Sequence, residues 1–484
     1  MSNNWIAGTL ELSSKVRYGL TSRSVPLFRF IPYNKKIGPF AVGCSSRNLF
    51  YNVHAIIQPE QRSPLVPRNT GELPRGIIVQ NLGPPTQETE KIVLLTTYAY
   101  DSTKSMRDEF PDGPLPFIDL EKRVRPIGFT FHIDPPGCRD VDDAVTVCKE
   151  NDIWHIWIHI ADVAEWVQEG SPIDFIARHR ATTFYSPSLT GGGEALYPML
   201  PRGLSEESAS LLPSKEEKPA ISLYFTWDPQ TKKSSKYTFY ETAISCDKSY
   251  TYDEASSLVE TVPELGVLAD MAESKDSHVW VERMMILYNT IVGMMLKQSK
   301  GAGLLRRHNG ANTEKAAELP KELYFLSYES AEHCATTADS TKHVGLERDA
   351  YAYASSPLRR YADLVNQRAL RQLLSNPEKP LPPTDADLIA NINRREKQAK
   401  AFQRDLFFSS CVASSQEGIE GQILSFDTEK KIHKVYVPAW KRMIKVKHLL
   451  EEPFPVGQTV AITWYEDRTK SQWKDKICFS LQKK

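Results

Sequence analysis

The segment Gly128-Phe-Thr-Phe-His-Ile-Asp134-Pro-Pro-Gly-Cys-Arg-Asp140-Val-Asp142-Asp143-Ala-Val145 carries four aspartates within ten residues. Apolar residues flank it on both sides, so we expect the cluster to lie against a core, with the Pro-Pro-Gly bend folding Asp134 back toward the others. Neighbouring carboxylates raise each other's pKa unless a positive group neutralises them. A divalent cation is the simplest such group, and oxygen ligands suit Mg²⁺ or Mn²⁺. The alternative is a solvated acidic turn.

An EF-hand is the nearest competing motif for this segment. Counted from Asp140, its sixth and twelfth positions lack the glycine and the glutamate that an EF-hand requires. Carboxylates that hold two metal ions about 4 Å apart most often serve the cleavage of phosphodiesters. We therefore predict phosphodiester hydrolysis, with Asp140, Asp142 and Asp143 as metal ligands and Asp134 as a further ligand or as the group that orients the attacking water.

The segment Ser355-Ser-Pro-Leu-Arg-Arg-Tyr-Ala-Asp363 predicts a helix that begins near Pro357 with Ser356 as its N-cap. Arg359 would then lie in the first turn, where a cation is normally disfavoured and an anion is welcome. Because a guanidinium clamps phosphate well, we expect Arg359 to meet a phosphate of the substrate. The alternative is that Arg359 and Arg360 form a surface pair with Asp363.

Together these two segments resemble the ribonuclease II superfamily, whose RNB domain carries an Asp-x5-Asp-x-Asp-Asp motif followed much later by Ser-Pro-[Ile/Leu]-Arg-[Arg/Lys]-Tyr. Further stretches match in the same order, and the resemblance spans about residues 125–412. They are His159-Ile-Ala-Asp-Val-Ala164, Tyr197-Pro-Met-Leu-Pro-Arg-Gly-Leu-Ser205, Leu304-Leu-Arg-Arg-His308 and His343-Val-Gly-Leu346.

The resemblance implies a Mg²⁺-dependent exoribonuclease that hydrolyses RNA from its 3′ end and releases nucleoside 5′-monophosphates. The four aspartates match the catalytic and metal-binding carboxylates of the family, and Arg359 matches the arginine that contacts the scissile phosphate. Three residues are expected to bind substrate: Tyr185 resembles the tyrosine that stacks on the 3′-terminal nucleotide, Glu396 a helical glutamate near it, and Arg360 accompanies Arg359. The alternatives are a buried aromatic for Tyr185 and a helical salt bridge to Lys400 for Glu396.

The resemblance, together with short β-leaning runs at both ends of the chain, predicts an α+β multidomain protein: a central RNB-type α/β catalytic domain flanked by small OB or cold-shock-like β-barrels. The expected parts are 1–65, a trimmed cold-shock-like barrel; 66–119, a second small β module; 120–414, the RNB domain; and 415–484, an OB-type RNA-binding barrel. Alternating residues predict a strand over 153–160, and helical periodicity predicts helices over 276–300, 359–375 and 385–413. A β-leaning run over 91–97 predicts a further strand.

Composition excludes several classes of protein. The 484 residues hold 60 basic and 60 acidic side chains, so a wholly basic nucleic-acid coat is excluded and binding must rely on local patches. Seven scattered cysteines without a Cys-x-x-Cys pair predict an intracellular, reducing compartment, the cytoplasm before an organelle. The apolar run 279–297 is interrupted by polar residues and predicts a buried helix, and no signal peptide or membrane partner is expected.

The function that we predict is therefore a 3′ to 5′ exoribonuclease acting on single-stranded RNA. The alternative is a catalytically weak, RNA-binding regulator of the same fold. Partners in RNA degradation are possible, and the sequence leaves the oligomeric state open.

Overall fold

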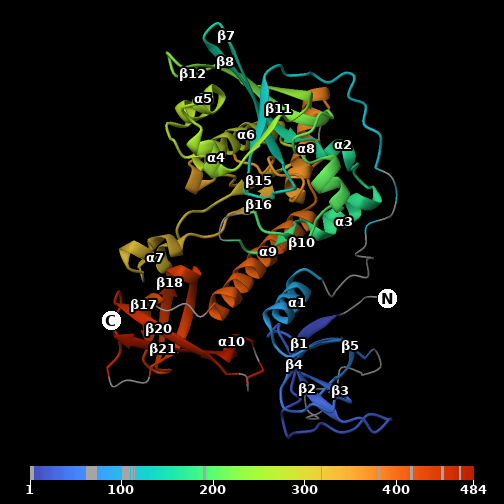
Figure 1. Ribbon diagram of the computed structural model, residues 1–484, viewed down its shortest axis with the longest axis vertical. Coiled ribbons are helices and arrows are strands. Elements are labelled where there is room, and N and C mark those ends of the chain that lie inside the picture. Colours follow the sequence, from blue (N-terminus) through green and yellow to red (C-terminus); the bar gives the residue numbers. More distant parts are fainter. Residues whose placement is uncertain are drawn as a thin grey trace. The chain divides into compact units, whose positions relative to one another are not determined.

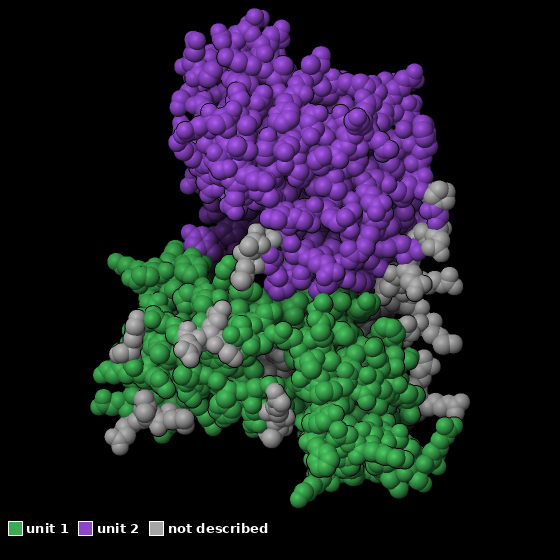
Figure 2. Space-filling view, in the orientation of Figure 1, with its two compact units in different colours: residues 1–106, 313–327, 398–484 green, residues 107–312, 328–397 purple. Residues whose placement is uncertain are grey.

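The computed structural model describes residues 5–60, 73–100, 110, 113, 115–188, 192–317, 319–379, 382–414, 418–448, 452–467, 470–471 and 473–483. The chain divides into two compact units, coloured separately in Figure 2. Unit 1 contains residues 1–106, 313–327 and 398–484, and unit 2 contains residues 107–312 and 328–397. Unit 1 therefore gathers both ends of the chain, while unit 2 holds the acidic segment and the arginine segment.

The N-terminal part of unit 1 is a closed five-stranded barrel with the strand order β1-β2-β3-β5-β4. The strands are β1 (Ile6–Leu10), β2 (Leu27–Pro32), β3 (Phe40–Gly43), β4 (Val53–Pro59) and β5 (Arg75–Gly83). This differs from the expectation of two N-terminal modules, because β5 lies within 66–119 and yet closes the barrel that begins within 1–65, pairing with both β3 and β4. The expected boundary at residue 65 itself falls outside the described residues.

The prediction of a strand over 91–97 is wrong, because these residues lie in the helix α1 (Gln87–Tyr98). Thr86 caps the helix in a reciprocal pair with Thr89, and Glu88 and Glu90 stand in the first turn, where the helix dipole favours acids. Burial of Val93 and Leu94 completes the stabilisation. Local capping and packing thus override the strand preference of the β-branched residues in this segment.

The C-terminal part of unit 1 is a five-stranded antiparallel sheet with the order β19-β18-β17-β20-β21, whose outermost strands β19 and β21 also lie in contact. The strands are β17 (Glu420–Asp427), β18 (Ile432–Val437), β19 (Arg442–Lys447), β20 (Thr459–Glu466) and β21 (Ile477–Lys483), with the short helix α10 (Trp473–Lys476) before β21. Trp440 is buried in its core. A small C-terminal β-barrel was expected here, and this sheet agrees with it.

Unit 2 is built on a sheet with the strand order β12-β11-β8-β7-β6-β14, on which β13 pairs with β11. Figure 1 labels β7, β8, β11 and β12 of this sheet. The strands are β6 (Phe129–Ile133), β7 (Asp143–Glu150), β8 (Ile153–Ala161), β11 (Lys218–Asp228), β12 (Lys233–Ser234), β13 (Thr238–Ile244) and β14 (Lys248–Tyr250). The alternating pattern of 153–160 correctly predicted β8. Ile156, Ile158 and Ile160 point into the core, and the residues between them point to the other face.

Helices of unit 2 cover the core face of this sheet. They include α4 (Tyr252–Ser257), α5 (Pro263–Ala272), α6 (Ser277–Ser299) and α8 (Tyr361–Ser375). The remaining helices with α-helical turns are α2 (Val163–Trp166), α3 (Pro172–Arg180) and α9 (Ala386–Ala413), and α9 continues from unit 2 into unit 1. Unit 2 also contains two short two-stranded sheets: β9 (Phe184–Tyr185) with β10 (Ala195–Tyr197), and β15 (Leu304–Arg307) with β16 (Glu332–Ala335).

Among the described helices, α6 alone is long and apolar enough to cross a membrane by length and composition, with a mean hydropathy of 1.2. In the structure a stripe along α6 packs into the core of unit 2, as helical periodicity predicts for a core helix. The stripe consists of Trp280, Met284, Tyr288, Val292 and Leu296.

The opposite face of the sheet carries a row of buried polar side chains, one from each of five strands. The row runs from Thr130 through Thr146, His159 and Ser222 to Thr242, and successive side chains are joined by hydrogen bonds of 2.6, 2.7, 2.6 and 2.6 Å. Burial lowers the pKa of His159 to about 3, so its imidazole is neutral. We refer to this row as the polar ladder. It links β6 and β7, the strands on either side of the acidic segment, to the rest of the sheet.

The chain thus has the expected mixed α+β architecture with small β-barrels. The short segment 313–327, which contains the helix α7 (Thr313–Ala317) and the 3-10 turn Lys321–Ser327, groups with unit 1 although the flanking residues belong to unit 2. All seven cysteines are unpaired.

Candidate active site

The acidic segment forms the connection between the antiparallel strands β6 and β7. Asp134 follows the last residue of β6, and its backbone N–H donates to the carbonyl of Tyr250 on β14. A turn at Pro135–Cys138, with Gly137 at a φ of 78°, bends the chain, and Asp143 is the first residue of β7. The structure therefore confirms the predicted bend and places it between two strands.

Asp142 is buried and is held by the arginine segment. Its Oδ1 accepts the backbone N–H of Leu358 at 2.8 Å, and its Oδ2 accepts Nε of Arg359 at 2.9 Å. Burial raises the pKa of Asp142 to about 7, against the lowering effect of Arg359. Burial also opposes the charge on Arg359, but the attraction of Asp142 outweighs it and raises the pKa of Arg359. Two segments more than 200 residues apart in the sequence thus meet at this pair.

Asp140 contacts Tyr185, which lies on the short strand β9. The hydroxyl of Tyr185 donates to Oδ2 of Asp140, and burial raises the pKa of this aspartate. The Tyr185 hydroxyl itself has a pKa well above its ordinary value, because burial and the nearby Asp140 oppose its ionisation. The predicted nucleotide-stacking tyrosine is therefore brought to the acidic cluster, which its position in the sequence alone could not guarantee.

The charge on Asp143 is disfavoured by two other carboxylates of the cluster. Burial, followed by repulsion from Asp134 and Asp142, raises the pKa of Asp143 well above its ordinary value. Asp134 is paired with His132, whose Nδ1 lies 2.9 Å from its Oδ2. The cluster therefore lacks enough positive charge among its protein neighbours to let all its carboxylates ionise freely.

This chemistry fits a hard divalent cation, since the donors are carboxylate oxygens and an added positive charge would relieve their repulsion. The positions of these carboxylates, in contrast, do not match those of a formed metal site. Among the described residues there is no group of three or more His, Cys, Asp or Glu side chains placed to hold a metal ion. The carboxylates already have hydrogen-bond partners within the protein. Asp142 accepts from Arg359 and from the Leu358 N–H, Asp140 accepts from Tyr185, and Asp134 contacts His132.

The start of the arginine helix was predicted wrongly. The helix α8 begins at Tyr361 with Arg360 at the N-cap position, and Ser356 makes no cap, because the segment 357–359 is a turn. A β-bridge between Thr182 and Arg360 and a bond from the Thr183 N–H to the Arg359 carbonyl hold Arg360 extended between this turn and the helix. Arg359 is therefore held by residues distant in the sequence and does not lie in the first turn of α8.

Arg360 points to a different set of partners from Arg359. Its Nη2 donates to Oδ1 of Asp363 at 2.7 Å, and its guanidinium lies 3.9 Å from the ring centre of Tyr353. The alternative, a surface pair of Arg359 and Arg360 with Asp363, thus holds only for Arg360, and that pair is largely buried. The part of Arg360 in substrate binding stays a prediction.

Glu396 lies on α9 and faces the interior of unit 2. Its carboxylate accepts Nη1 of Arg306 at 2.9 Å and contacts Nε2 of His333 at 2.8 Å. Burial alone would raise the pKa of Glu396, but His333 and Arg306 together hold it well below its ordinary value. Glu396 therefore belongs to a buried ionic network that the sequence did not predict, and not to a surface pair with Lys400.

Two supporting residues of the cluster also escaped sequence reasoning. His132 precedes Asp134 by two residues and lies on the same face of the chain, a spacing that could have indicated the contact. Gly193 lies against the residue that follows Tyr185, and a Cβ at Gly193 would collide with the carbonyl oxygen of Ser186. Glycine is thus required at 193 for β9 and β10 to approach each other.

A comparison of the sequence with protein-family models also singles out these two segments. The model of the RNB domain matches residues 119–274 and 322–376, which include both the acidic segment and the arginine segment. Over these residues, which are fewer than half of the chain, the protein is similar to RNB domains. Exoribonuclease 2 of Sodalis glossinidius (strain morsitans) is 26% identical over 355 residues, which cover 57% of this chain and 54% of the relative. The chain spans about half the length of the curated relatives it matches.

Solved structures confirm the fold. The apo form of Mycoplasma genitalium RNase R superposes with a TM-score of 0.74 at 15% identity and covers 99% of this chain and 90% of that chain. The yeast protein Ssd1, described as a pseudonuclease, superposes with a TM-score of 0.68 at 18% identity and covers 92% of this chain and 65% of its own. The fold is therefore common to a ribonuclease and to a pseudonuclease.

Proposed function

We propose that this protein is a metal-dependent exoribonuclease that degrades single-stranded RNA from its 3′ end and releases nucleoside 5′-monophosphates. The observation that carries the proposal is the acidic cluster itself. All four aspartates of the motif are present. Burial raises the pKa of Asp140, Asp142 and Asp143, and repulsion from neighbouring aspartates adds to the effect at Asp142 and Asp143, as expected where a cation is to be bound.

In this proposal Asp140, Asp142 and Asp143 would hold Mg²⁺ or Mn²⁺, with Asp134 as a further ligand or as the acceptor of a proton from the attacking water. The ion would supply positive charge to the phosphate and lower the pKa of a bound water. The side chain of Arg359 is partly exposed. While Nε stays on Asp142 and Nη2 donates to Ser356, its remaining N–H groups can donate to a phosphate oxygen. Tyr185 would stack on the terminal nucleotide once its hydroxyl leaves Asp140.

RNA as the substrate is supported by relatives that carry ribonuclease names and by the structures of M. genitalium RNase R in complex with RNA. In this chain, the exposed Lys445 and Lys447 of β19 offer positive charge for a phosphate backbone, whereas Arg442 on the same strand is paired with the buried Asp405. A solvated basic strand explains these lysines equally well, so their binding role belongs to the proposal.

A second function is favoured by one specific observation. The acidic carboxylates are engaged by Arg359, Tyr185 and His132, and the pseudonuclease Ssd1 shares the fold. A catalytically weak RNA-binding regulator is therefore the second candidate.

One assay separates the two candidates. The protein is incubated with single-stranded RNA labelled at the 5′ end or at the 3′ end, in the presence of Mg²⁺ or EDTA, and the products are resolved on a gel. Mononucleotides released from the 3′ label in Mg²⁺ alone support the exoribonuclease. A stable shift of intact RNA supports the regulator, and internal fragments from both labels would contradict both by indicating an endonuclease.

A further inference from the structure

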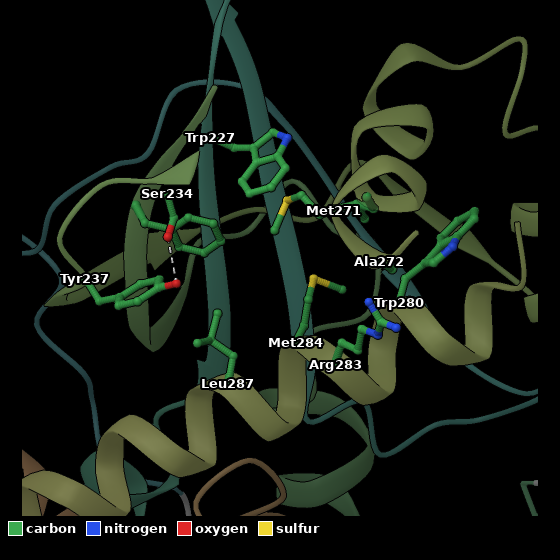
Figure 3. A pocket seen from close by; sticks show the side chains of 11 residues that line it. Trp227, Ser234, Tyr237, Met271, Ala272, Trp280, Arg283, Met284 and Leu287 are labelled. Carbon is green, nitrogen blue, oxygen red and sulfur yellow. Dashed lines mark hydrogen bonds between the residues drawn. The ribbon is translucent and has the colours of Figure 1, made fainter. Parts of the chain in front are cut away.

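Unit 2 contains a cavity of about 190 Å³ that is separate from the acidic cluster (Figure 3). It lies between the distal ends of β11, β12 and β13 and the helices α5 and α6. Along β8, Asp143 pairs with Ile160, whereas the cavity residue Trp227 pairs with Trp154. Six residues of strand at about 3.3 Å each place the two sites about 20 Å apart, at opposite ends of the sheet.

The walls of this cavity are aromatic rings and methionines, and their polar atoms already have partners. The indole N–H of Trp227 donates to Asp270, and that of Trp280 donates to the carbonyl of Ser274. The hydroxyl of Tyr237 lies 2.8 Å from that of Ser234, as the dashed line in Figure 3 marks. None of these groups therefore needs a ligand to be satisfied.

Arg283 differs from these groups, because its side chain is exposed and reaches solvent. It extends from α6 on the same side of the cavity as Met284, and it is the one charged side chain of the lining (Figure 3). Within the described parts of the chain, no hydrogen bond or ion pair engages its guanidinium. Asp270 on α5 accepts the indole N–H of Trp227 and lies 3.9 Å from Nζ of Lys232. An apolar cavity thus opens beside an unpaired positive charge.

The size and the walls limit what can bind. A dry apolar cavity of about 150 Å³ holds a benzene molecule, so this cavity has room for one aromatic ring and a short arm. Rings such as Trp227 offer edge and face contacts to another ring, and the methionine side chains Met271 and Met284 adapt to its outline. A fully charged or highly polar ligand would lose its hydration without compensation on these walls.

We propose that this cavity is a binding site for a small aryl carboxylate, whose ring enters between β11 and α6 and whose carboxylate pairs with Arg283. A planar guanidinium binds a carboxylate through two parallel hydrogen bonds, which fixes the direction in which the ligand enters. The site does not depend on the metal chemistry of the acidic cluster, and its existence is independent of the proposed function.

The test uses the full chain and two probes of equal shape, 3-phenylpropionate and its uncharged amide 3-phenylpropanamide. Binding is measured by isothermal titration calorimetry and by the change in tryptophan fluorescence, since two tryptophans line the cavity. We expect the acid to bind saturably and at least about tenfold more tightly than the amide. Arg283→Gln should lower the affinity for the acid to that for the amide and leave the affinity for the amide unchanged.

Two further variants keep the outcome interpretable. Lys233→Gln removes a positive charge from the neighbouring strand β12 without touching the lining, and it should leave the affinity of the acid unchanged. Leu287→Trp fills the cavity and should abolish the binding of both probes, while circular dichroism and the melting temperature report whether the variant is folded. Equal affinity for acid and amide in the natural chain, no saturable binding, or equal effects of Arg283→Gln and Lys233→Gln would overturn the proposal.

Discussion

Arg359 donates from Nε to Oδ2 of Asp142 at 2.9 Å, and Asp142 also accepts the backbone N–H of the residue before Arg359. The arginine segment therefore holds one carboxylate of the acidic cluster through both a side chain and the backbone. This contact fixes the orientation of Asp142 and leaves the side chain of Arg359 partly exposed beside the cluster. It is the structural basis of the first two predictions.

Asp143→Asn should abolish the Mg²⁺-dependent release of mononucleotides and leave the affinity for RNA nearly intact. The variant also removes a charge that burial, Asp134 and Asp142 disfavour, so in EDTA its melting temperature should be equal to or above that of the natural chain. Asp152→Asn, at the exposed tip of the same hairpin, is the control for both measurements. Unchanged nucleotide release by Asp143→Asn would sink the proposed assignment.

Arg359→Gln should lower kcat by about 10²- to 10³-fold, the usual cost of removing one group that stabilises charge in the transition state. The variant loses the donors to Asp142 and Ser356, and Arg359→Lys should recover only part of the activity because an ammonium cannot bridge two acceptors in the same way. The control Arg125→Gln breaks an exposed pair with Glu217. An equal, small effect of Arg359→Gln and Arg125→Gln on kcat would argue against the role.

Glu396→Gln should destabilise the protein by about 3–5 kcal/mol, because it leaves Arg306 buried without its carboxylate partner. The matched control is Glu332→Gln on β16, where the half-exposed pair with Arg307 is worth about 1 kcal/mol or less. Urea denaturation of the full chain, followed by circular dichroism, compares the two. Similar losses of stability would show that the buried network matters no more than the surface pair.

Glu90→Gln should change the pH dependence of stability. Burial raises the pKa of Glu90 from 4.5 to about 7, so between these pH values the unfolded chain releases this proton while the folded chain keeps it. The free energy of unfolding therefore falls by up to about 3 kcal/mol as the pH rises from 4.5 to about 7. Above about pH 7 this group causes no further fall. Relative to the natural chain, Glu90→Gln should gain stability from pH 4.5 to about 7.

Melting temperatures of the natural chain and of Glu90→Gln, measured from about pH 4 to about pH 8, give this difference directly. Glu88→Gln on the same helix is exposed and should show no such trend. A difference between Glu90→Gln and the natural chain that is flat with pH, or that shrinks as the pH rises, would contradict the assignment.

Gly193→Ala should cost about 1–3 kcal/mol, because a Cβ at this position would collide with the carbonyl oxygen of Ser186 and the two short strands would have to separate. Activity should fall with stability, since Ser186 follows Tyr185. Gly203→Ala is a close control, because no atom lies within 4 Å of the point that its Cβ would occupy, and the change should be nearly neutral. Melting temperature and nucleotide release are the two readouts, and equal effects of both substitutions would contradict the packing argument.

Patterns that are local in the sequence were predictable. The alternation of apolar residues predicted β8, the helical period predicted α6 and α9, and the spacing of aspartates predicted the turn and the cluster. Contacts between distant segments were not. The bridge from Thr182 shifted the start of α8, and Glu396 found partners 90 and 63 residues away. Such contacts depend on how the chain closes in space, which periodicity does not encode.

The polar ladder has a direction. The hydroxyl of Thr242 donates to the carbonyl of Ala220, so it must accept from Ser222, and Ser222 must then accept from Nδ1–H of His159. Nε2 of His159 is left as the acceptor for Thr146, whose own oxygen accepts from Thr130. His159 is therefore the Nδ1-protonated tautomer, and the hydroxyl dipoles from Thr130 to Thr242 all point the same way across the sheet. Protonating His159 would force the Thr130 end of this chain to reverse, which links the charge state of one buried ring to the strands that carry the acidic cluster.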